Sequence, residues 1–137
     1  MSPVFLDTSG LIAVVNTDDQ WHPAAEAIWQ ELAGASASLL TTSLVLIELG
    51  DGLSRIGQRQ LAVELYDRLH YSPRVEIVAL THPLETAAWE LFRQRPDKEW
   101  GVTDCVTFVV MKQRGIPAAL TVDHHFEQAG FQRLLRA

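Results

Sequence analysis

Apolar residues follow two alternating patterns along the chain. Short continuous apolar runs are each followed by a segment in which apolar residues return every three or four positions. Such runs predict strands that are covered on both faces, and the longer spacing predicts amphipathic helices. The expected strands are residues 3–6, 37–41, 75–80 and 118–122, with a last short strand from residue 131. The expected helices are residues 11–15, 23–32, 43–56, 58–70, 83–93 and 104–114, with a helical turn at 125–129.

Local signals support several of these boundaries. Pro23 suits the first turn of a helix, and Thr42 or Ser43 can cap the helix that follows the second strand. Thr103 is expected to cap the helix that Gly115 ends. Strands that alternate with helices predict an α/β layered fold with a parallel sheet.

Four carboxylates occupy positions that are otherwise apolar. Asp7 and Asp123 each follow the end of an expected strand, Glu48 interrupts an apolar helical segment, and Asp104 opens another. An isolated carboxylate in such a setting costs on the order of several kcal/mol unless something neutralises it. All four can reach the carboxyl edge of a parallel sheet, where open α/β folds place their ligands.

The residue types suggest a chemistry for this edge. Carboxylates that converge repel one another, so each takes up a proton or a counter-ion. Oxygen ligands without a sulfur or imidazole companion favour Mg²⁺ or Mn²⁺ over zinc. Such ions activate a water molecule and stabilise a leaving oxygen. Hydrolysis of a phosphodiester is therefore the leading reaction class.

Length and composition indicate one ordinary globular domain, residues 1–137. The 137 residues are 47% hydrophobic and 20% charged. Cys105 is the only cysteine, so no internal disulfide can form, and the cytoplasm is the expected location. No apolar run reaches the roughly 18 residues of a membrane helix, and no signal peptide is expected.

The net charge of -6 counts weakly against nucleic acid as a partner. Divalent metal bound by the four acids would, however, change the charge around them. Nine of the 11 basic residues are arginine, which suits bidentate contacts with phosphate.

Four segments of the chain resemble one family. Residues 5–9, 42–49, 102–106 and 120–126 are similar to the motifs of PIN-domain ribonucleases, in particular of VapC toxins from bacterial toxin–antitoxin pairs. The segments occur in the family's order and at its usual separations, and they span nearly the whole chain. The resemblance implies a three-layer α/β/α fold with a central, mainly parallel sheet of four to five strands.

The resemblance also implies roles for particular residues. The acids that it assigns to metal binding and catalysis are Asp7, Glu48, Asp104 and Asp123. Thr8 or Ser9 would hold a carboxylate or a metal-bound water, and Thr121 is similar to the hydroxyl residue that often precedes the last acid. The adjacent His124 and His125 are less typical of the family. They could contact phosphate or metal, although adjacent histidines on a turn more often face solvent, and the sequence does not decide their role.

For activity and partners, the resemblance implies an Mg²⁺- or Mn²⁺-dependent endoribonuclease that acts on RNA. It further implies a homodimer and a cognate antitoxin whose C-terminal segment lies across the active-site groove. The apolar faces of residues 44–69 are the best candidates for the dimer contact, although they could equally be core. The alternative is a PIN-fold RNA-processing nuclease without an antitoxin.

Other classes fit less well. A receiver domain needs a further aspartate after a central strand and a lysine after a late one. The third expected strand ends in residues 79–81 without an aspartate, and the only lysines are Lys98 and Lys112. A haloacid-dehalogenase-type phosphatase needs a second aspartate at the position of Ser9. A non-catalytic PIN fold usually lacks one of the acids, and all four are present.

Aromatic and basic residues leave two readings open. Trp21 and Trp100 fall in expected loops, where they could stack an RNA base or anchor the loop to the core. Arg93, Arg95 and Lys98 could follow an RNA backbone or simply form a solvated helix end. Trp29 and Trp89 lie at helical spacing and are expected to pack inside.

Overall fold

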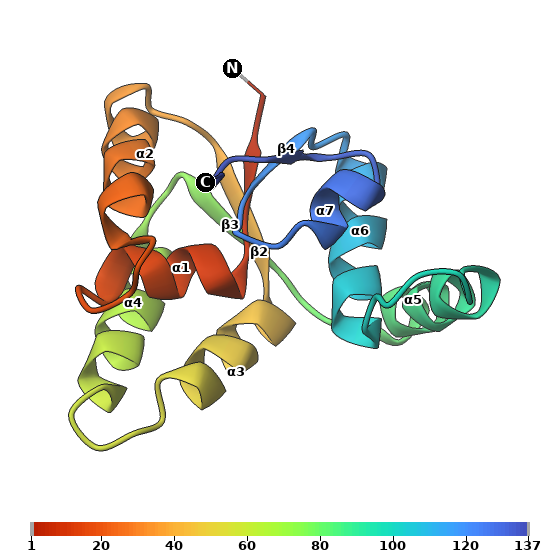
Figure 1. Cartoon of the computed structure of the whole chain (residues 1–137), viewed down its shortest axis with the longest axis horizontal. Coiled ribbons are helices and arrows are strands. Elements are labelled where there is room, and N and C mark those ends of the chain that lie inside the picture. The colour runs from red at the N-terminus through yellow and green to blue at the C-terminus, as the bar shows by residue number, and fades with distance from the viewer. Residues whose placement is uncertain (1, 137) are drawn as a thin grey trace.

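A five-stranded parallel sheet forms the centre of the molecule in the computed structural model, which describes residues 2–136 (Figure 1). The strands are β1 Val4–Leu6, β2 Leu39–Thr42, β3 Val75–Val78, β4 Ala118–Leu120 and β5 Gln132–Arg133. They are hydrogen-bonded in the order β3-β2-β1-β4-β5, and every pairing is parallel. This confirms the α/β fold with a parallel sheet.

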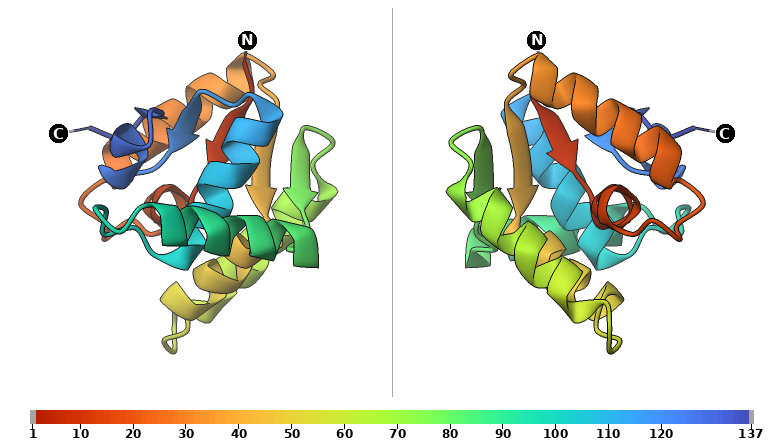
Figure 2. Two further views of the ribbon diagram at one scale, coloured as in Figure 1. Left: turned by 90° about the vertical axis from the view of Figure 1, so that its right-hand side faces the viewer. Right: turned by 90° about the vertical axis from the view of Figure 1, so that its left-hand side faces the viewer.

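Seven helices accompany the sheet within the described residues. They are α1 Thr8–Val15, α2 His22–Gly34, α3 Ser43–Gly52, α4 Arg59–Tyr71, α5 His82–Gln94, α6 Val102–Arg114 and α7 His125–Gln128. α1, α2 and α4 lie on one side of the sheet, and α5 and α6 lie on the other (Figures 1 and 2). The result is the expected three-layer arrangement. No helix among residues 2–136 is long and apolar enough to cross a membrane.

β1 is the central strand and determines where the functional residues meet. It pairs with β2 on one side and with β4 on the other, with Phe5 opposite both Leu40 and Ala119. All three residues of β1 and all three of β4 are buried, as expected for strands covered by helices on both faces. Because the strands are parallel, the carboxyl ends of β1, β2 and β4 lie at one edge of the sheet.

Two predicted helix boundaries are confirmed, and one is wrong. Thr42 caps α3 by accepting a hydrogen bond from the Val45 N–H, and Gly115 ends α6 in the left-handed conformation with φ of 65°. Thr103 is not a cap, because α6 begins at Val102, two residues before the expected start at residue 104. The N-cap is Gly101, whose N–H donates to Asp104 Oδ2 at 2.9 Å.

The first helix begins earlier than the sequence predicts. α1 starts at Thr8 rather than at residue 11, so Gly10, which precedes the expected helix, lies inside the observed one. A Cβ atom at Gly10 would lie 2.1 Å from the Leu120 carbonyl oxygen. Only glycine therefore lets α1 pack this closely against β4.

α3 is shorter than expected. It ends at Gly52 rather than at residue 56, and the Ile56 side chain is 99% exposed. The helix therefore ends before Gly57, the residue that was expected to break it.

The tryptophans occupy different environments from one another. Trp100 is buried, packs edge-on against Phe108, and donates from Nε1 to Gln128 Oε1 at 3.1 Å. It anchors its loop to the core, so the reading in which it stacks an RNA base is wrong. Trp29 packs against the core, as predicted. Trp89 is 48% exposed and contacts Phe92 on the surface of α5, so its predicted packing inside is wrong.

Candidate metal centre

A cleft of about 300 Å³ opens at the carboxyl edge of the central strands. Four carboxylates from distant parts of the chain line it, together with Ile12 and four threonine and serine residues. The carboxylates are Asp7, Glu48, Asp104 and Asp123. The structure therefore brings all four acids of the sequence analysis to one cleft.

Three of the four acids lie at the start of a helix or after the end of a strand, and the fourth lies within a helix. Asp7 links β1 to α1, and its backbone N–H donates to the Leu120 carbonyl at 3.2 Å, which ties it to β4. Glu48 lies within α3, and Asp104 lies in the first turn of α6. Asp123 lies between β4 and α7. Three of the four thus sit at or beside a chain reversal, where a backbone turn aims the side chain into the cleft.

Hydroxyl groups hold the Asp7 carboxylate. Thr121 Oγ1 donates to Asp7 Oδ2 at 2.7 Å, and Ser9 Oγ donates to the same oxygen at 3.1 Å. Both hydroxyls also accept backbone hydrogen bonds, Ser9 from the Val122 N–H and Thr121 from the Asp123 N–H. The orientation of Asp7 therefore depends on the segment that follows β4.

Thr8 serves a different acid. Its Oγ1 donates to Glu48 Oε1 at 3.1 Å, across 40 positions of sequence. The two adjacent hydroxyl residues thus orient two separate carboxylates.

Burial makes these acids hold their protons more tightly. It raises the pKa of Asp7 to about 6, although the hydrogen bonds from Thr121 and Ser9 oppose the rise. Burial also raises the pKa of Glu48, and the negative charge of Asp104 adds to that rise. The pKa of Asp104 is raised by burial first and by the charge of Asp123 next.

The donor set of the cleft fits a hard divalent cation. None of the described residues that line it is a lysine or an arginine, so no lysine or arginine of its lining neutralises its negative charge. Carboxylate and hydroxyl oxygens are the ligands that Mg²⁺ and Mn²⁺ prefer. A bound cation would also offset the repulsion and burial that raise the pKa values of Asp7, Glu48 and Asp104.

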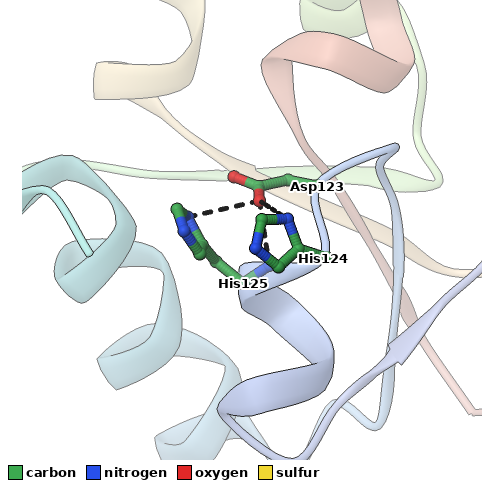
Figure 3. Close-up of side chains that lie close together, drawn as sticks. All are labelled: Asp123, His124 and His125. Atoms are coloured by element: carbon green, nitrogen blue, oxygen red, sulfur yellow. Dashed lines mark hydrogen bonds and ion pairs between the residues drawn. The ribbon is translucent and has the colours of Figure 1, made fainter. Parts of the chain in front are cut away.

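A histidine that the sequence analysis left without a role faces two of the acids. His125 Nδ1 lies 3.3 Å from Asp123 Oδ1 and 3.7 Å from Asp104 Oδ2 (Figure 3 shows the Asp123 side). His124 points to Asp123 as well, at 3.8 Å, but its side chain is 65% exposed. Asp123, His124 and His125 can each offer one ligand atom within 4.8 Å of the others. The only sequence signal for His125 was its place two residues after the last acid.

Comparison with known proteins agrees with this geometry. Residues 4–132 match the PIN domain family. The chain is 34% identical over 129 residues to the 23S rRNA-specific endonuclease VapC20 from two strains of Mycobacterium tuberculosis, covering 93% of this chain and 95% of the relative. This chain therefore belongs to the PIN-domain family.

A solved structure extends the likeness to three dimensions. The crystal structure of VapC20 from Mycobacterium tuberculosis, described as a toxin that cleaves the sarcin–ricin loop, superposes with a TM-score of 0.81. The match has 31% sequence identity and covers 93% of this chain and 95% of that one. The fold is thus that of a PIN-domain protein of the VapC type.

Proposed function

We propose that this chain is a metal-dependent endoribonuclease that hydrolyses RNA phosphodiester bonds and acts as the toxin of a VapBC-type pair. One observation carries the proposal. Four carboxylates line a single cleft, and among the described residues no lysine or arginine lines it. Their number, their position at the strand ends and the family relationship all favour a nuclease over a purely structural acidic cluster.

The metal is part of the proposal. When bound, Mg²⁺ or Mn²⁺ would supply an activated water and stabilise charge on the phosphate oxygens. The chain's own residues fix the geometry of the cleft: Thr121 and Ser9 orient Asp7, and Thr8 orients Glu48. Above about pH 6 Asp7 is mostly ionised and can act as an acceptor of cations or protons.

The acids at the open side of the cleft face the substrate. The side chains of Asp104 and Asp123 are 24% and 31% exposed, whereas Asp7 is held by two hydroxyls at the inner end. We assign Asp7, Glu48, Asp104 and Asp123 together as the metal-binding and catalytic residues. A phosphodiester entering the cleft would meet Asp104 and Asp123 first.

Ribosomal RNA is the substrate that we propose to test first. The relative with 34% identity is specific for 23S rRNA, and the similarity extends over 93% of this chain. We propose that the chain cleaves this RNA in the cytoplasm. Cleavage of ribosomes, mapped by primer extension, would locate the site of cutting, and messenger or transfer RNA cleaved in its place would redirect the assignment.

Two protein partners belong to the same proposal. Ile47, Ile56, Val63 and Tyr66 are exposed apolar residues within or beside α3 and α4, which supports a homodimer contact on that side. A cognate antitoxin would block the cleft with a peptide segment. The alternative, an RNA-processing nuclease without an antitoxin, would be favoured if the neighbouring reading frame encodes no small DNA-binding protein.

The test is RNA cleavage by the purified chain with Mg²⁺ or Mn²⁺. We expect Asp7→Asn and Asp104→Asn each to lower the rate at least about 100-fold, because each removes a charged ligand of the centre. Asp97→Asn is the control, since this acid pairs with Arg95 in the loop between α5 and α6. If neither cleft variant slows cleavage, catalysis does not occur at this site.

A further inference from the structure

We infer that His125 supplies an imidazole nitrogen to the metal centre, beside the carboxylates of Asp104 and Asp123, and that this mixed donor set favours Mn²⁺ over Mg²⁺. The inference rests on the metal-dependent function proposed above and adds a ligand that the four acids do not include. It also gives His125 a task that the sequence alone did not assign.

The distances suit three ligands of one ion. Neighbouring ligands at about 2.1 Å from an octahedral ion lie about 3 Å from each other. His125 Nδ1 is 3.3 Å from Asp123 Oδ1 and 3.7 Å from Asp104 Oδ2, so small side-chain rotations would bring all three atoms onto one cation. The imidazole thus approaches two carboxylates that come from different elements, α6 and the turn after β4.

The Nδ1 atom faces the two carboxylates at ion-pair distance but forms no hydrogen bond among the described residues. It is closed to solvent. A buried polar atom without a hydrogen bond lowers the stability of the folded chain. Coordination of a cation would use its lone pair and remove that cost.

The backbone holds the imidazole in place. The His125 N–H donates to Asp123 Oδ1 at 2.9 Å, which fixes the first residue of α7 against the last acid. The next residue, Phe126, is buried and packs edge-on against Phe108. The ring therefore enters the centre already oriented, whereas the neighbouring His124 side chain is mostly in solvent.

The consequence concerns which ion binds. Mg²⁺ demands oxygen ligands and gives up its waters reluctantly, so an imidazole adds little to its affinity. Transition-metal ions accept imidazole together with carboxylate. A nitrogen at this position therefore raises the affinity for Mn²⁺ relative to Mg²⁺.

The direct test is pulsed electron paramagnetic resonance of the Mn²⁺-loaded protein. The wild-type chain should show the nitrogen coupling of a directly bound imidazole, and ¹⁵N-labelling of histidine should change it. The coupling should disappear in His125→Ala and persist in His124→Ala, the matched control. By calorimetry, His125→Ala should weaken Mn²⁺ binding at least about tenfold and Mg²⁺ binding much less.

Three results would overturn the inference. Wild-type protein that binds Mn²⁺ without nitrogen coupling excludes His125 as a ligand, and this measurement needs no folded variant. If the coupling disappears in His124→Ala and persists in His125→Ala, the nitrogen ligand is His124 and not His125. An equal loss of Mn²⁺ and Mg²⁺ affinity in His125→Ala would contradict the selectivity. In each case the four-acid site stands, and only wild-type protein that binds neither ion would contradict the metal-dependent function as well.

Discussion

Thr121 holds Asp7 through a hydrogen bond of 2.7 Å between Thr121 Oγ1 and Asp7 Oδ2, although 114 positions separate the two residues. Thr121 is completely buried at the end of β4, and its Oγ1 accepts the Asp123 N–H while donating to Asp7. One hydroxyl therefore couples the first acid of the cleft to the backbone of the last. Because of this coupling, we expect the loss of the Thr121 hydroxyl to change the pH dependence of RNA cleavage.

Thr121→Val should shift the acid side of the pH–rate profile to higher pH. The Thr121 hydrogen bond stabilises the ionised form of Asp7 and so lowers its pKa against the effect of burial. Without it the pKa of Asp7 rises further, and we expect cleavage at pH 6 to fall about tenfold more than cleavage at pH 8. The rate of RNA cleavage between pH 5 and pH 9 measures the shift.

Thr107→Val is the matched control for this experiment. Thr107 lines the same cleft from α6 but is not among the hydrogen-bond partners of Asp7. Its substitution should leave the pH profile in place. If the pH profile shifts equally in Thr121→Val and Thr107→Val, the cause is the lower polarity of the cleft and not the loss of the Thr121 hydrogen bond.

Asp7→Asn should stabilise the metal-free protein while removing its activity. The pKa of Asp7 is raised to about 6, so the folded state binds more protons than the unfolded state between about pH 4 and pH 6. The stability that this gives is fully present below about pH 4 and is lost as the pH rises to about 6. Asparagine avoids that loss, which amounts to roughly 2 to 3 kcal/mol at neutral pH.

Chemical denaturation in the presence of a chelator tests this prediction. Wild type and Asp7→Asn should have similar stability near pH 4 and should diverge as the pH rises to 7. Asp18→Asn, in the exposed turn between α1 and α2, provides the comparison for a surface acid. Equal free energies of unfolding for wild type and Asp7→Asn at pH 7 would show that Asp7 is not held at an energetic cost.

Gly10→Ala should destabilise the fold strongly. The added methyl group would lie 2.1 Å from the Leu120 carbonyl oxygen, which is backbone and cannot rotate away. Separating α1 from β4 to make room should cost at least the upper part of the ~1–3 kcal/mol typical of overpacking. Thermal unfolding measures the loss.

Gly34→Ala offers a control of the opposite sign. No atom lies within 4 Å of the Cβ position at Gly34, which ends α2. Alanine there should be neutral or stabilise the helix by up to about 1 kcal/mol. If Gly10→Ala and Gly34→Ala change the stability equally, the close approach of α1 to β4 is not the reason that glycine is needed at position 10.

Saturating Mn²⁺ or Mg²⁺ should raise the melting temperature. A ligand that binds only the folded state stabilises it by about 2.7 kcal/mol at a concentration 100 times its dissociation constant. The shift should shrink in Glu48→Gln and Asp104→Asn, because each removes a charge from the cleft. A melting temperature that the ions leave unchanged would contradict metal binding by the folded chain.

The order of strands and helices could be predicted from the sequence because the apolar runs and the capping residues agree. Thr42 and Gly115 act locally, so their positions in the sequence were sufficient. Gly10 misled the prediction, since its role depends on the later strand β4 that passes beside it. Trp89 misled it in another way, because helical spacing does not say whether a face meets the core or solvent.

The acids of the site could also be predicted, whereas their partners could not. Asp7, Glu48 and Asp123 stood out because each breaks or ends an apolar run. Which hydroxyl reaches which carboxylate depends on how α1 and α3 cross, so the pairing of Thr8 with Glu48 needed the fold. His125 carries no pattern of its own and becomes informative only when α7 places it beside Asp104.

The strand order has a consequence for the timing of synthesis. β1 emerges from the ribosome before the other strands of the sheet, and one of its two neighbours, β4, emerges more than 100 residues later. Asp7 therefore has no Thr121 to orient it, and the cleft has no Asp123, until the segment that follows β4 has been synthesised. A growing chain of this architecture therefore cannot assemble the four-acid cleft until four of the five strands of its sheet have been made.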